Sequence, residues 1–207
     1  MQTVLKQDIK SQPILGHSDA NGTPKTVRWT RNQYYRMAEL GFFKGKQVEL
    51  INGEIIEISP MKPAHATAVR LFLDVLRNIF GNGFVVDSQL PLSLGKADEP
   101  EPDIAVVKGN SPDFSESHPK TAELIVEVAD SSLNFDRAKK ASLYAENKIN
   151  EYWILNLKNR CLEVYRRPTK DKNLGFIYTE IYVAGEDETV SPLTKPKAKI
   201  KVLDILP

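Results

Sequence analysis

The sequence predicts an α/β (α+β) domain with one central mixed sheet flanked by helices. Three observations support this fold class: two or three segments with helical spacing of apolar residues, several short apolar runs typical of strands, and an irregular order of the two. Apolar residues make up 41% of the 207 residues, which is enough for a core. The single cysteine, Cys161, excludes an intrachain disulfide, so we expect packing alone to hold the fold.

The N-terminal part of the chain begins with a polar stretch and continues into a helix. Residues 1–26 have little periodicity, and we expect a flexible arm there, followed by one domain over residues 27–207. Thr30 and Gln33 form a capping-box pattern, which predicts that a helix begins at this point. Gly41 is a natural residue for its end.

A hairpin and a long helix are expected next. The strand-like runs Val48–Ile51 and Glu54–Ile58 flank Asn52-Gly53, the dipeptide that most strongly favours a two-residue hairpin turn. The segment Pro63–Phe80 has apolar residues at helical spacing and precedes a glycine.

The rest of the chain alternates strands with one shorter helix. We expect that helix over Ala138–Lys148. Strands are expected at Phe84–Val86, around Gln89, and at Ile104–Val107, Leu124–Val128, Glu151–Leu155, Leu162–Arg166 and Ile177–Val183, with a weak strand or loop at Lys199–Ile205.

Composition restricts the classes of function. The 28 basic and 27 acidic residues leave a net charge of +1, so nucleic acid could be bound only through a local basic patch. The three histidines are scattered and lack the spacing of a zinc site. No signal-peptide core is visible, and no apolar run approaches the roughly 18 residues of a membrane span. We therefore expect a cytoplasmic protein that does not span a membrane.

Acidic residues in predicted strands need an explanation. Asp103 opens a strand behind a proline, and Glu127 interrupts the apolar run LIVEV. Burying an unpaired carboxylate costs several kcal/mol, so Glu127 forms a structural salt bridge, points from a sheet edge into water, or serves a site. Asp136 lies where the N-cap of the next helix is expected, and we interpret it as structural.

Asp103, Glu127 and Lys140 together suggest a metal-dependent hydrolase. Carboxylate oxygens are the ligands that Mg²⁺, or Mn²⁺, prefers. A lysine close to such an ion can stabilise the charge that develops on a phosphate. Two acids and a lysine are common in proteins, so their presence alone does not identify a site.

The sequence segments around these residues are more specific than the presence of two acids and a lysine. The segments VELINGEIIEISPMKPAHA, EPEPDIAVVKG and AELIVEVADSSLNFDRAKKASLYAENKINEYWILNL occur in this order. Together they resemble the Uma-type family of putative restriction endonucleases, a domain of unknown function within the PD-(D/E)XK nuclease superfamily. The resemblance extends from Val27 to the C-terminus. It implies a restriction-endonuclease-like fold, with a mixed central sheet between helices.

The resemblance also implies roles for single residues. Asp103, behind Pro102, matches the PD element and becomes a metal ligand. Glu127 becomes the second ligand, and the backbone carbonyl of Val128 a third. Glu49 matches an acid that approaches the same site from the N-terminal side.

The lysine departs from the plainest form of the superfamily motif. Ala129 stands where a strict ExK would place the lysine, and Lys140 on the following helix is the matching position. Lys139 points about 100° away around a helix, so only one of the two can face the site. Lys140 shares a helix face with Tyr144, which we interpret as aromatic core.

Two further residues are candidates for support of the site. His65 is expected either to contact a phosphate, to support Glu49, or only to touch solvent at a helix start. Gln89 is expected to reach the site as a hydrogen-bonding partner behind the metal ligands. Tyr152 and Trp153 are expected to be strand core, not platforms for stacked bases.

The leading functional hypothesis is a Mg²⁺-dependent endonuclease that acts on DNA, with Glu49, Asp103, Glu127 and Lys140 as its active site. The alternative is a catalytically silent nuclease fold that binds or assembles. A weaker one is a hydrolase of small phosphoesters. Cleavage of a duplex needs two sites for two strands, so a homodimer is also expected.

Overall fold

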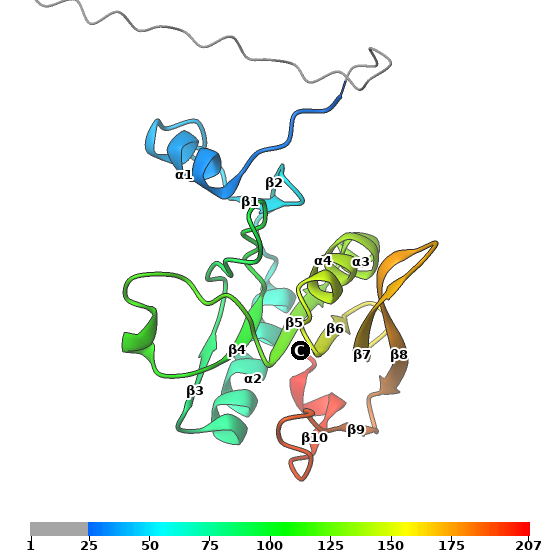
Figure 1. Ribbon diagram of the computed structural model, residues 1–207. Helices are drawn as coiled ribbons and strands as arrows, with labels where there is room; N and C mark the ends of the chain where they lie inside the picture. The colour runs from blue at the N-terminus through cyan, green and yellow to red at the C-terminus, as the bar shows by residue number, and fades with distance from the viewer. Residues whose placement is uncertain (1–24) are drawn as a thin grey trace, which may run out of the picture.

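The computed structural model describes residues 25–207, so residues 1–24 of the predicted arm lie outside the described part of the chain. A six-stranded sheet with the strand order β3-β4-β5-β6-β7-β8 forms the centre of the molecule (Figure 1). The strands are β3 (Phe84–Asp87), β4 (Ile104–Lys108), β5 (Leu124–Ala129), β6 (Glu151–Asn156), β7 (Cys161–Asp171) and β8 (Gly175–Gly185).

The strand pairing makes the sheet mixed, as the sequence predicts. β5 and β6 run parallel, with Ile125 opposite Tyr152, while the other neighbouring pairs are antiparallel. Between β4 and β5, Ile104 lies opposite Val126. This register brings the residue just before β4 next to the fourth residue of β5.

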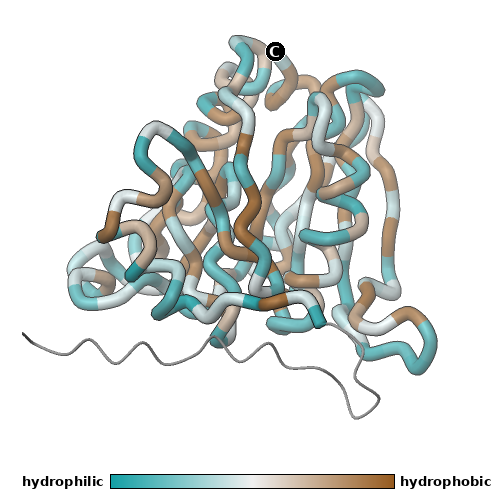
Figure 2. Tube along the Cα trace, turned by 90° about the horizontal axis from the view of Figure 1, so that it is seen from above, coloured by the Kyte–Doolittle hydropathy of each residue, from teal (hydrophilic) through white to brown (hydrophobic). Residues whose placement is uncertain are grey.

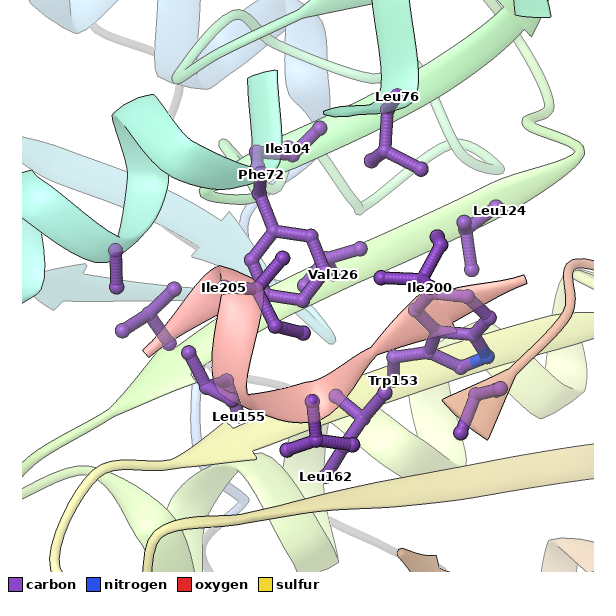
Figure 3. Close-up of a cluster of buried hydrophobic side chains, with 14 of the residues drawn as sticks. Phe72, Leu76, Ile104, Leu124, Val126, Trp153, Leu155, Leu162, Ile200 and Ile205 are labelled. Carbon is purple, nitrogen blue, oxygen red and sulfur yellow. The ribbon is translucent and has the colours of Figure 1, made fainter. Parts of the chain in front are cut away.

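One face of the sheet is covered by the long helix α2 (Pro63–Phe80) and by the C-terminal segment. The C-terminal segment contains β9 (Thr189–Val190), β10 (Ile200–Lys201) and a 3₁₀ helix (Val202–Ile205). Figure 3 shows apolar side chains from α2, the central strands and this segment meeting in one cluster. The cluster includes Phe72, Leu76, Ile104, Leu124, Val126, Trp153, Leu155, Leu162, Ile200 and Ile205.

The other face is covered by a second helical segment. It consists of α3 (Leu133–Phe135), a π-helical turn (Asp136–Lys140) and α4 (Ala141–Glu146). Tyr144 from α4 packs there against Tyr152 with ring centroids 5.0 Å apart. Along the tube of Figure 2, apolar stretches lie mainly in the strands, and hydrophilic ones lie at loops and outer helix faces.

The N-terminal elements form a small unit at one end of the molecule (Figure 1). It contains α1 (Arg31–Glu39) and the hairpin of β1 (Val48–Ile51) and β2 (Glu54–Glu57). The capping box of Thr30 and Gln33 and the hairpin turn at Asn52-Gly53 are confirmed. Backbone hydrogen bonds between Leu50 and Glu99, 2.7 and 3.4 Å long, join β1 to the segment before β4.

Two expectations about local structure are wrong. The second helical segment begins at Leu133, not at Ala138, and Ser132 is its N-cap residue, so Asp136 lies inside the helix and caps nothing. Gln89 lies outside the strands and has a positive φ of 54°. None of the helices within residues 25–207 combines the length and apolar character needed to cross a membrane.

Candidate active site

A cavity of about 490 Å³ lies where β1, the start of α2, the start of β4, the end of β5 and the π-helical turn converge. Its wall contains most of the residues that the sequence points to. They are Glu49, His65, Gln89, Asp103, Glu127 and Lys140.

Asp103 and Glu127 are neighbours across the β4–β5 pair. The backbone N–H of Val128 donates to Asp103 Oδ2 over 2.8 Å, and the N–H of Asp103 lies 3.4 Å from Glu127 Oε2. Antiparallel residues that lie opposite each other point to the same face, so the register places both carboxylates on one side of the sheet. Glu127 is 3% exposed, which excludes the interpretation as an edge residue in water.

Lys140 extends from the π-helical turn toward Glu127 and Glu49. Its Nζ donates to Glu127 Oε1 over 2.9 Å and lies 3.5 Å from Glu49 Oε1. Lys140 is buried and Lys139 is exposed, so the helix presents only one of the two lysines to the site. Glu49 is carried into place by β1, which is bonded to the segment before β4.

Tyr144 contributes a contact that the interpretation as aromatic core missed. Its hydroxyl donates to Glu127 Oε1 over 2.8 Å, on the same oxygen that Lys140 contacts. The sequence signal was the spacing of four residues from Lys140, which places both side chains on one helix face.

Asp136 and Glu101 also belong to the site, although sequence reasoning did not select them for it. Both line the cavity. Asp136 is 2% exposed and accepts a 2.6 Å hydrogen bond from the Ser132 hydroxyl. Glu101 was recognisable only by its place between two prolines, two residues before Asp103.

Several carboxylates surround the single buried cation Lys140, and this excess of acidic groups changes the pKa values of the cluster. Burial raises the pKa of Glu127, Lys140 lowers it, and the charges of Asp103, Asp136 and Glu49 raise it further, with a net pKa of about 8. Burial also raises the pKa of Glu49 and of Asp136. Burial lowers the pKa of Lys140, but the surrounding carboxylates outweigh it and raise that pKa. The cluster therefore lacks positive charge, and a divalent cation would supply it.

His65 supports a different acid from the one expected. Its Nε2 lies 2.9 Å from Asp103 Oδ1, so it is Asp103 and not Glu49 that it contacts. Gln89 is within reach of the same oxygen, with Nε2 at 3.5 Å. Both residues therefore approach the same oxygen of Asp103, and their support of a metal ligand stays a prediction.

The donor set fits a hard divalent ion through two carboxylates, those of Asp103 and Glu127. Within residues 25–207, no group of three or more His, Cys, Asp or Glu side chains is arranged to hold a metal ion. Ligands from the backbone or from water would have to complete the shell. Val128 is 1% exposed and its N–H binds Asp103; the role of its carbonyl as a ligand stays a prediction.

The wall of the cavity is acidic as a whole. The acids that line it are Glu49, Glu57, Glu101, Asp103, Glu127, Asp130 and Asp136, and the lysines are Lys62 and Lys140. The Nζ atom of Lys62 lies 2.7 Å from Asp130 Oδ2, so the charge of Lys62 is already partly neutralised. A positive groove for nucleic acid is therefore not formed by these side chains alone.

Comparison with known proteins gives a consistent result. A solved structure described as a putative nuclease belonging to DUF820, from Anabaena variabilis ATCC 29413, matches with a TM-score of 0.62 and 15% identity, over 77% of this chain and 89% of that one. At this identity the match shows the fold alone. No curated protein matches. The model of the Uma2 family, described as putative restriction endonuclease, matches residues 31–202, and the chain belongs to this family.

Proposed function

We propose that the protein is a Mg²⁺-dependent endonuclease that hydrolyses phosphodiester bonds of DNA, with Mn²⁺ as a substitute ion. The observation that carries this proposal is the buried contact of Lys140 with Glu127 beside Asp103, in a cavity. The membership in a family of restriction-endonuclease type supports it.

The residues divide the work according to their chemistry. Asp103 and Glu127 would hold the ion, which would supply Lewis-acid chemistry at a phosphate oxygen and at a water molecule. Lys140 remains protonated among the carboxylates and stabilises negative charge that develops on the phosphate. Glu49 lies close to Lys140 and adds a carboxylate to the same side of the cavity.

His65 and Gln89 act through Asp103. Their contacts to Oδ1, together with the Val128 N–H on Oδ2, fix the orientation of this carboxylate. A fixed ligand loses less freedom when the ion binds, so both residues strengthen metal binding without touching the substrate.

The test is cleavage of supercoiled plasmid DNA with Mg²⁺, with Mn²⁺ and with a chelator. An endonuclease converts circular DNA into nicked and linear forms, whereas an exonuclease cannot begin on a closed circle. We expect cleavage with either ion and none with the chelator. The Asp103→Asn variant should lose it.

A matched control is Asp74→Asn, which makes the same change at an exposed position of α2 outside the cavity wall. It should cleave like the wild-type protein. Cleavage that survives Asp103→Asn unchanged would contradict the assignment of the active site to Asp103, and the absence of cleavage by wild-type protein on every DNA form would overturn the proposal.

One observation favours a second candidate, a catalytically silent fold that binds a partner. The cavity wall carries more acids than lysines, which repels a phosphate backbone unless cations are present. Wild-type protein that binds Mn²⁺ but cleaves neither DNA nor RNA would support this candidate. The predicted homodimer is tested separately by sedimentation.

A further inference from the structure

Glu127 presents its two oxygens to different surroundings. Oε1 accepts one hydrogen bond from Lys140 Nζ at 2.9 Å and another from the Tyr144 hydroxyl at 2.8 Å. Among residues 25–207, Oε2 has only a long contact, 3.4 Å, to the backbone N–H of Asp103. The two donors therefore occupy Oε1 and leave Oε2 on the side of Asp103.

Tyr144 is well fixed for this role. The side chain is completely buried, and its ring packs against Tyr152. It follows Lys140 by four residues in the same helical segment, so both donors approach Glu127 from one helix face. A lysine alone can follow a rotating carboxylate on its flexible stem, whereas a packed tyrosine ring cannot.

We infer that Tyr144 is a positioning residue that presents Oε2 of Glu127 to the divalent cation. This inference rests on the proposed function, because it assigns the oxygen that binds the proposed ion. Tyr144 acts through Glu127 and touches neither the ion nor the substrate.

The variant Tyr144→Phe keeps the packed ring and removes only the hydroxyl. Loss of a hydrogen-bonding partner behind a metal ligand weakens metal binding by about 10- to 100-fold in other proteins. We expect about a tenfold higher dissociation constant for Mn²⁺. The maximal cleavage rate at saturating Mn²⁺ should stay within about twofold of wild type, because the ion and Lys140 are then both in place.

Tyr178→Phe is the matched control. Tyr178 is also buried, packs against the same Tyr152 ring, and donates its hydroxyl to the backbone carbonyl of Ile149 at 2.9 Å. The substitution removes a buried tyrosine hydroxyl from the same aromatic cluster and alters no hydrogen bond to Glu127. This variant should bind Mn²⁺ like wild type.

The experiment is a calorimetric titration of Mn²⁺ into the full-length wild-type protein and both variants, with circular dichroism to confirm folding. Weaker binding by Tyr144→Phe alone supports the inference. Equal affinity of Tyr144→Phe and wild type overturns it and leaves the proposed function standing, as does equal weakening in both variants. If wild-type protein binds no Mn²⁺, the proposed function and the inference both fail.

Discussion

Two glutamates on the same face of the sheet are both buried and both bound by the π-helical turn, yet their surroundings differ. Glu163 on β7 accepts from Arg137 at 2.6 and 2.9 Å, from Tyr165 at 2.9 Å and from Asn156 at 3.2 Å. Both of its oxygens have donors, and the arginine balances its charge.

Glu127 on β5 is paired less completely. Within the described residues 25–207, one of its oxygens has two donors and the other has a single long contact. Burial raises its pKa, and three further carboxylates raise it as well. Burial of an acid in a central strand therefore does not by itself mark a functional site. The unbalanced charge and the open oxygen beside a cavity distinguish Glu127 from Glu163, and equivalent substitutions at the two positions test the distinction.

The largest difference should appear in cleavage. Glu127→Gln removes a proposed metal ligand, so we expect DNA cleavage to fall on the order of 10³-fold. Its metal-free stability should hold or rise, because burial disfavours the ionised carboxyl in the folded state and a neutral amide avoids this cost. Plasmid nicking and thermal denaturation measure the two effects. Glu163→Gln, compared at equal folded fraction, should cleave DNA at a rate within a few-fold of wild type. A 10³-fold loss of cleavage in Glu163→Gln would contradict the distinction between the two glutamates.

Lys140 should matter for both chemistry and stability. Lys140→Met leaves the buried carboxylates without this cation, which should destabilise the metal-free protein by about 3 kcal/mol. Saturating Mn²⁺ should restore part of this stability, while cleavage remains about 100-fold reduced.

Urea denaturation with and without Mn²⁺ separates the two roles of Lys140. Full recovery of cleavage by Mn²⁺ would reduce Lys140 to a structural counterion. The matched substitution Lys139→Met changes the exposed neighbour and should alter neither property.

Glu163 should matter for stability alone. Breaking a buried ion pair costs roughly 3–5 kcal/mol, but Arg137 is 43% exposed and water compensates part of the loss. We therefore expect Glu163→Gln to lower the free energy of unfolding by about 2 kcal/mol at neutral pH, measured by urea denaturation. An unchanged free energy would show that the pair contributes no more than a surface salt bridge.

The parts of this comparison differ in how well the sequence predicts them. The capping box at Thr30, the turn at Asn52-Gly53 and α2 rest on local signals, and all three are confirmed. The sequence pattern places the start of the second helical segment at Ala138, whereas the segment begins at Leu133. Its π-helical turn contacts distant strands, since Arg137 binds Glu163 and Lys140 binds Glu127. A π-helical turn that depends on such contacts has no local sequence pattern.

In the site, too, some features follow from local sequence signals and others depend on contacts between distant elements. Asp103 and Glu127 stand out as acids at or in apolar strands, and the resemblance to the family selects them from the other acids. The register makes them neighbours. The partner of His65 and the contact of Tyr144 depend on how α2 and α4 lie on the sheet, which spacing alone does not determine. Their roles in metal binding stay predictions until an ion is titrated.

The smallest expected effect is the pH dependence of the Glu163 pair. Burial raises the pKa of Glu163, but the hydrogen bonds from Arg137, Tyr165 and Asn156 outweigh it, so the pKa lies below its ordinary value of 4.5. A carboxyl whose pKa is lower in the folded state stabilises the protein above the unfolded-state pKa and loses this contribution as the pH falls through the folded-state value. The stability gap between wild type and Glu163→Gln should therefore be complete at pH 6 and shrink below about pH 4.5. Urea denaturation of both proteins across this range measures the gap, and a gap that stays constant in acid would show that hydrogen bonding, not the charge of Glu163, holds Arg137 in place.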